Sequence, residues 1–143
     1  MMFSWLHALL PLRSRTSEDA TSVLAVTCSD RERSALHEIA SKSNWRLCFA
    51  SSSTDAEKYL REQPIAVILC DRDLPGTPWR DHMGDLLRSA PHSCVILVSG
   101  VNDEYLWEEV IRYGGYDVLT KPLRESQVVP AVTGAWWYWK LRR

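Results

Sequence analysis

Short apolar runs alternate along the chain with longer stretches in which apolar residues recur every three or four positions. The longer stretches are amphipathic, and their spacing predicts four helices between the apolar runs and a fifth after Pro122. The apolar runs themselves predict five strands, at residues 23–27, 45–50, 65–70, 94–98 and 116–120. Strands that alternate with helices in this way are typical of a parallel sheet with helices on both faces.

The order of the strands follows from their polarity. The first, third and fourth runs are almost continuously apolar, which indicates strands buried on both faces. The second run alternates around Arg46 and the fifth contains Asp117, so these two suit the edges of the sheet. With right-handed crossovers the predicted fold is an α/β, flavodoxin-like, doubly wound (βα)5 domain with five parallel strands in the order 2-1-3-4-5. Ligands of such a sheet bind beyond the carboxyl ends of its strands.

The composition narrows the class of protein. A length of 143 residues fits one domain, and we assign residues 22–143 to it and residues 1–21 to an N-terminal extension and polar linker. The 17 Lys and Arg and 18 Asp and Glu give a net charge of -1, which argues against nucleic acid as a direct partner. The apolar stretch at 3–12 is too short for stable membrane insertion, so we expect a cytoplasmic protein. Its four scattered cysteines predict buried, reduced thiols.

Three chemically active side chains end successive strands. Asp71 follows the third strand, Ser99 closes the fourth, and Lys121 closes the fifth. Because the carboxyl ends of parallel strands share one edge of the sheet, we expect the carboxylate, the hydroxyl and the ammonium to converge there. Together these groups can accept a phosphoryl group.

This pattern resembles the receiver domain of two-component response regulators over residues 22–142. Asp71 opens a D-x-x-L-P-G motif at the place of the family's phospho-accepting aspartate, Ser99 stands at its Ser or Thr, and Lys121 precedes Pro122 as in its Lys-Pro pair. The resemblance implies a stand-alone relay, not an enzyme, in which a histidine kinase or phosphotransfer protein phosphorylates Asp71. It also implies a possible homodimer through the fourth helix, the fifth strand and the fifth helix, with a downstream protein partner that the sequence does not name.

One departure from the family concerns the metal. Two acidic residues at the end of the first strand join the phospho-acceptor in holding Mg²⁺ in the family, whereas Thr27 and Cys28 stand at those positions here. Hard cations prefer oxygen anions, so Mg²⁺ affinity should fall sharply. Asp71 then remains as a metal ligand, with Asp30 as the candidate second one, although Asp30 also suits the N-cap of the first predicted helix, as Asn102 suits that of the fourth.

Two other functions are therefore open. One is an atypical pseudo-receiver that acts as a constitutive interaction module with weak or no phosphorylation. The more distant one is a flavin-binding flavodoxin-like protein, which the sequence opposes because no Gly-rich or Ser/Thr-rich phosphate loop follows Val26. We therefore assign no cofactor-binding residue.

The end of the last predicted helix is unusually aromatic. Residues 136–139 read Trp-Trp-Tyr-Trp, more ring surface than one helical face can bury. Three explanations remain open: a protein interface shared with Trp107, a cover supplied by the N-terminal Phe3, Trp5, Leu6 and Leu9, or contact with a membrane surface aided by the basic tail.

Overall fold

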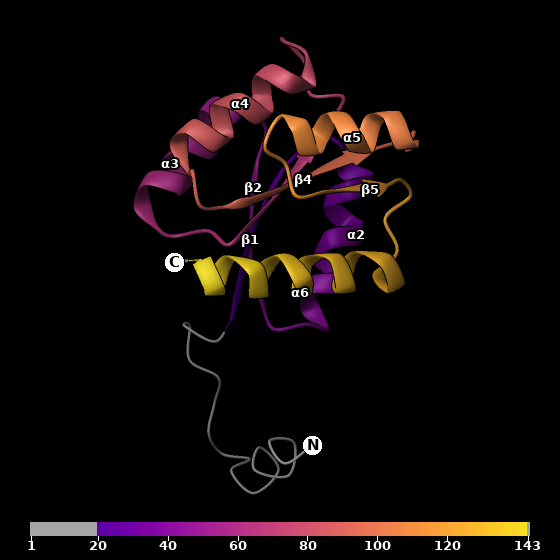
Figure 1. The fold of residues 1–143 in the computed structure, drawn as a ribbon. Helices are drawn as coiled ribbons and strands as arrows, with labels where there is room; N and C mark the ends of the chain where they lie inside the picture. The colour runs from indigo at the N-terminus through magenta and orange to yellow at the C-terminus, as the bar shows by residue number, and fades with distance from the viewer. Residues whose placement is uncertain (1–19, 143) are drawn as a thin grey trace, which may run out of the picture.

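The computed structural model describes residues 20–142, and it contains the predicted sheet. All five strands are parallel, in the order β2-β1-β3-β4-β5, which confirms the predicted fold. The arrangement is visible in Figure 1. The strands are β1 (Thr21–Val26), β2 (Trp45–Ala50), β3 (Val67–Asp71), β4 (Cys94–Ser99) and β5 (Asp117–Thr120).

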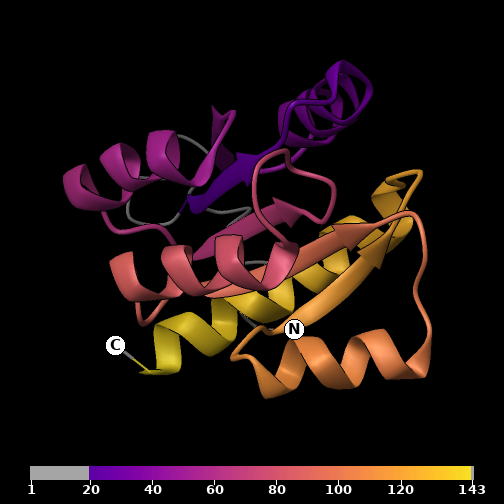
Figure 2. The same cartoon turned by 90° about the horizontal axis from the view of Figure 1, so that it is seen from above.

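The helices form one layer on each face of the sheet. Figure 2 looks down onto the sheet, with α4 in front of the strands and α6 behind them. The core contacts place α2 on the same face as α6, and α3 and α5 on the same face as α4. The helices are α2 (Asp30–Ser41), α3 (Ser53–Glu62), α4 (Trp79–Ser89), α5 (Glu104–Arg112) and α6 (Glu125–Arg142). Among the described residues, none of these helices is long and apolar enough to cross a bilayer. The N-terminal stretch at 3–12 lies outside the described residues.

The starts of two helices correct the sequence analysis by one residue. The side chain of Ser29, not Asp30, caps α2 by accepting from the backbone N–H of Glu32 at 3.2 Å. Asp103, not its neighbour Asn102, caps α5 by accepting from Leu106 N–H at 2.8 Å. In each case the capping residue has an extended backbone and stands three residues before the amide that it satisfies, as N-cap geometry requires.

Alternation along the central strands divides the core between the two layers. Leu24, Ile68 and Leu97 are fully buried on the α3, α4 and α5 side, whereas Val23 and Ile96 are fully buried on the α2 and α6 side. Successive side chains of a strand point to opposite faces of the sheet, so Asp71 lies on the same face as Val67 and Leu69. That face is the one covered by α2 and α6. The fold therefore brings the end of β3 next to the start of α2.

Candidate functional site

Asp71 is the last residue of β3 and lies at the rim of the sheet, 5% exposed. Its Oδ1 accepts hydrogen bonds from the Lys121 ammonium at 2.9 Å and from the Asp73 backbone N–H at 3.0 Å. Its Oδ2 accepts from the Thr27 hydroxyl at 3.3 Å. The carboxylate of Asp71 is thus bound on both of its oxygens by groups of this chain.

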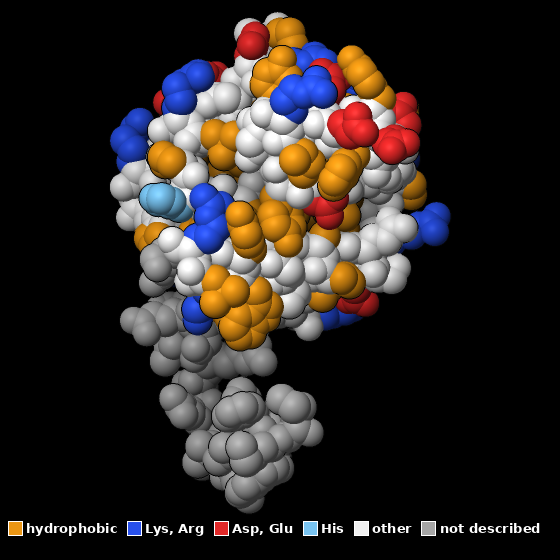
Figure 3. Space-filling model, in the orientation of Figure 1, with side chains coloured by type: hydrophobic (Ala, Val, Ile, Leu, Met, Phe, Trp, Pro, Cys, Tyr) orange, Lys and Arg blue, Asp and Glu red, His pale blue; other side chains and the backbone are white. Residues whose placement is uncertain are grey.

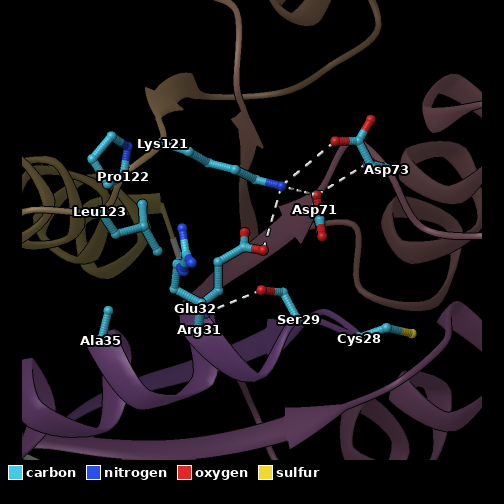
Figure 4. Close-up of a pocket in the computed structure, with 10 residues that line it drawn as sticks. All are labelled: Cys28, Ser29, Arg31, Glu32, Ala35, Asp71, Asp73, Lys121, Pro122 and Leu123. Atoms are coloured by element: carbon cyan, nitrogen blue, oxygen red, sulfur yellow. Dashed lines mark hydrogen bonds and ion pairs between the residues drawn. The ribbon is translucent and has the colours of Figure 1, made fainter.

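Lys121, directly after β5, faces three carboxylates. Besides Asp71, its Nζ lies 3.3 Å from Glu32 Oε2 and 3.6 Å from Asp73 Oδ2 (Figure 4). Partial burial lowers the pKa of Lys121, but the hydrogen bond to Asp71 and the charges of Asp71 and Glu32 raise it more, so the net shift is upward. Lys121 is therefore held as a cation at the centre of this cluster.

The sequence analysis did not find Glu32. Its carboxylate is buried and reaches from the first turn of α2 toward Lys121, as Figure 4 shows. Burial and the charge of Asp71 raise its pKa, and together they outweigh the attraction of Lys121, which lowers it. Glu32 and Asp71 are thus two buried carboxylates that share one ammonium.

The local sequence contains a signal that explains the position of Glu32. Ser29 and Glu32 have the S-x-x-E spacing of a capping box, in which the Glu side chain usually turns back to the backbone N–H of the cap. Here that N–H donates to the Thr27 hydroxyl at 3.0 Å instead. Because Thr27 satisfies this donor, the Glu32 carboxylate is able to face the rim.

The sequence analysis also considered Asp30 and Cys28 for the metal site, and both side chains are exposed. Asp30 is exposed and does not line the cleft at the rim, so the carboxylate that meets Asp71 is Glu32 instead. Cys28 is also exposed, its thiol donates to Ser51 O at 3.2 Å, and in Figure 4 its side chain points away from Asp71. The prediction of four buried thiols is therefore wrong for Cys28, and Cys48 is only partly buried because it lies on the edge strand β2.

The residues present do not fit the Mg²⁺ that the resemblance implies. The hydroxyl of Thr27 lies between Asp71 and Glu32, and Cys28 offers a thiol, which is a poor ligand for a hard cation. The ammonium of Lys121 occupies the space between the two buried carboxylates. No group of three or more His, Cys, Asp or Glu side chains suited to a metal exists in the part of the chain that the structure describes.

Ser99 is fully buried, and its hydrogen bonds lead away from the carboxylates. Asp71 pairs with Val98 in the sheet, and Ser99 is the next residue of β4. The side chain of Ser99 therefore leaves its strand on the face opposite to that of Asp71. Its Oγ accepts from Val101 N–H at 3.1 Å and from the guanidinium of Arg72 at 3.4 Å. The structure thus brings Asp71 and Lys121 into direct contact and connects Ser99 to Arg72.

An open cleft of about 690 Å³ lies beside this cluster. One wall contains Asp71, Glu32 and Lys121, and the other is formed by apolar atoms of Ala35 and Leu123. Figure 4 shows Leu123 and Ala35 on the side of the cleft away from Asp73. The cleft gives solvent access to the carboxylates at the rim.

Comparisons with known proteins agree with this fold. The chain is 28% identical over 120 residues to the hydrogenase transcriptional regulatory protein HoxA of Cupriavidus necator, covering 83% of this chain and a quarter of that relative. A signal receiver domain of an HD domain-containing protein from Pseudomonas fluorescens Pf-5 has a TM-score of 0.79 at 21% identity, over 92% of this chain and 97% of the other. The beryllofluoride-activated NtrC4 receiver domain, solved as a dimer, has a TM-score of 0.74 at 23% identity, over 82% of this chain and 98% of the other.

The model of one protein family matches residues 15–133, which is most of the chain. The order of the strands agrees with that match. The chain belongs to the response regulator receiver domain family.

Proposed function

We propose that this chain is an atypical receiver domain that signals through protein contacts, without Mg²⁺-dependent phosphorylation of Asp71. The observation that carries the proposal is the ion pair between the Lys121 ammonium and the buried Glu32 carboxylate, with Nζ and Oε2 3.3 Å apart. The group that would stabilise a new anion at Asp71 is thus already paired with two carboxylates.

The charge around Asp71 supports this proposal. Phosphoryl donors are anions, and three carboxylates surround the single ammonium of Lys121 at the rim. In the family a divalent cation offsets such repulsion, but the donors at Thr27 and Cys28 do not suit one. An anionic donor that approaches Asp71 therefore meets repulsion that the single ammonium of Lys121 offsets only in part.

The exposed face of α5 is the surface on which we place the protein contacts. Tyr105 is 68% exposed, and Trp107 and Ile111 are exposed on the same helix. Aromatic side chains are enriched at the energetic centres of protein interfaces. Figure 3 shows hydrophobic and acidic side chains next to each other over this helix, which favours a protein partner with an apolar patch and basic groups at its rim.

A bridge between two helices holds part of this face in place. The guanidinium of Arg80 on α4 pairs with the buried Glu109 of α5 and lies over the rings of Trp79 and Tyr113. Such cation–π contacts and ion pairs fix side chains that would otherwise move freely. The surface is therefore preformed, as a constitutive interaction module requires.

A phosphorylation assay tests the proposal. The protein is incubated with Mg²⁺ and acetyl phosphate, and intact mass spectrometry measures one added phosphoryl group. We expect no adduct on the wild-type chain and a Mg²⁺-dependent adduct on the variant Thr27→Asp/Cys28→Asp, which restores the two carboxylates. Adding Asp71→Asn to that variant should abolish the adduct.

A second candidate function is a conventional receiver that accepts a phosphoryl group on Asp71. It is favoured by the 2.9 Å contact of Lys121 with Asp71 and by the open cleft beside them. A stoichiometric adduct on the wild-type protein that Asp71→Asn removes would establish this function and refute the first. A histidine kinase or phosphotransfer protein would then be the donor.

A further inference from the structure

The last turns of α6 carry aromatic rings on every side of the helix. Successive residues of an α-helix are 100° apart, so the four consecutive residues Trp136, Trp137, Tyr138 and Trp139 point in four directions. Only Trp139 lies in the core, whereas Trp137 is 54% exposed and Leu141, one turn on, is 82% exposed. We call Trp136, Trp137, Tyr138 and Leu141 the aromatic collar.

The collar is ordered by its own contacts. Trp136 and Trp137 meet edge to face with centroids 4.9 Å apart, and Tyr138 lies 5.6 Å from the ring of Tyr116. Lys140 lies over Trp136, and Arg142 lies over Tyr138. The surface is therefore apolar, aromatic and basic, and it is formed before any ligand binds.

The collar lies at the edge of the sheet where the chain enters the domain. The end of α6 is at the amino ends of the strands, because Cys94, the first residue of β4, donates its thiol hydrogen to Ala135 O. β1 starts at the same edge, where Thr21 pairs with the partly buried Trp45 of β2. Val23 and Trp139 then belong to one buried cluster. Figure 2 shows the start of β1 and the end of α6 on the same side of the molecule.

The chain itself supplies a segment that matches this surface. Residues 3–12, outside the described part, contain Phe3, Trp5, Leu6 and Leu9, and residues 13–20 connect them to β1. Eight extended residues span at most about 27 Å, enough to place the segment against the neighbouring end of α6.

We propose that the apolar N-terminal segment, residues 3–12, binds the aromatic collar of α6 within the same chain. A short tether gives the segment an effective concentration in the millimolar range. A second copy of the protein would lose overall translational and rotational freedom on binding, at an estimated cost of about 4–15 kcal/mol. A tethered occupant therefore covers the collar more readily than a second copy does.

Photo-cross-linking of the full chain tests this assignment. Leu6 is replaced by p-benzoyl-phenylalanine, the protein is irradiated, and mass spectrometry maps the cross-link. We expect cross-links from position 6 to peptides of α6 within monomers. The yield should fall at least about fivefold in Trp137→Ser/Leu141→Ser and should be unchanged in Tyr105→Ser, an equally exposed aromatic on α5. Cross-links to other parts of the monomer, between two chains, or only when anionic vesicles are present would overturn the proposal.

Hydrogen exchange gives a second measurement that does not change the collar. In the full chain, Leu6→Asp/Leu9→Asp should speed the exchange of amides in the last two turns of α6 several-fold. The matched control Ser14→Asp/Ser17→Asp adds the same charge to the polar linker and should leave that exchange unchanged. Equal exchange in both variants and the wild type would show that the segment does not bind α6.

Discussion

Removing the Lys121 ammonium is the most direct perturbation of the pocket. The variant Lys121→Met keeps most of the aliphatic stem but leaves Asp71 and Glu32 without a cation. The ammonium lies 2.9 Å from Asp71 and 3.3 Å from Glu32, and at an effective dielectric constant of about 20 each attraction amounts to roughly 5–6 kcal/mol. Desolvation and the repulsion between the two carboxylates offset much of this.

The measured effect should therefore be smaller than the gross attraction. Removing one partner of a buried ion pair typically costs about 3–5 kcal/mol, and Lys121 is partly exposed. We expect Lys121→Met to lower the free energy of unfolding by about 3 kcal/mol at pH 7. Combining it with Glu32→Met, which removes one of the two unpaired carboxylates, should restore about 1–2 kcal/mol.

Urea unfolding of the single and double variants measures these differences. The loss in Lys121→Met should shrink between pH 7 and pH 5, because the Glu32 carboxyl, whose pKa is raised, takes up a proton more readily once the ammonium is gone. Lys42→Met, at an exposed pair with Glu38, is the control and should change stability by less than about 1 kcal/mol. A loss in Lys121→Met as small as in the control, with no dependence on pH, would refute the electrostatic account of the pocket.

Three further outcomes are expected. The pKa of Glu32 is raised in the folded state, which means that its charged form opposes folding. Glu32→Gln should therefore stabilise the protein at pH 7. A pH series of unfolding curves should show this gain disappear below the ordinary Glu pKa of 4.5. Met83 is fully buried, so Met83→Ala should lower the free energy of unfolding by about 2–5 kcal/mol in urea titrations. Gly115→Ala would place its Cβ 2.5 Å from Val110 Cγ1 and should lower the free energy of unfolding by about 1–3 kcal/mol. Gly100→Ala has open space around the new methyl group and should leave the melting temperature unchanged.

The sequence contains enough information to predict the sheet because burial on both faces leaves a strong pattern. β1, β3 and β4 are continuous apolar runs, and the chain has no other way to bury them than under helices on both sides. Hydrophobic periodicity does not locate helix starts to a single residue, since Ser29 and Asp30 are both good caps and only the backbone geometry selects between them. The prediction for α2 was wrong for that reason.

The same limit explains why Glu32 was not predicted. A glutamate in the first turn of a helix is ordinarily exposed, or turned back to the cap, and nothing in its spacing from Lys121 marks the two as neighbours. Their contact depends on a third residue, Thr27, whose hydroxyl oxygen accepts the hydrogen bond from the backbone N–H of Ser29. Residues 27 and 32 therefore have to be considered together.

Considered together, these two residues influence which cation the pocket can hold. Carboxylates at the end of β1 would favour a diffusible divalent metal, whereas a hydroxyl there and a carboxylate on α2 favour the ammonium of Lys121, which is covalently part of the chain. A metal enters and leaves with conditions, but Lys121 is always present at its full effective concentration. Lys121 then counters part of the charge of Asp71 from within the chain, as we propose for a signalling surface that needs no phosphoryl group to take its shape.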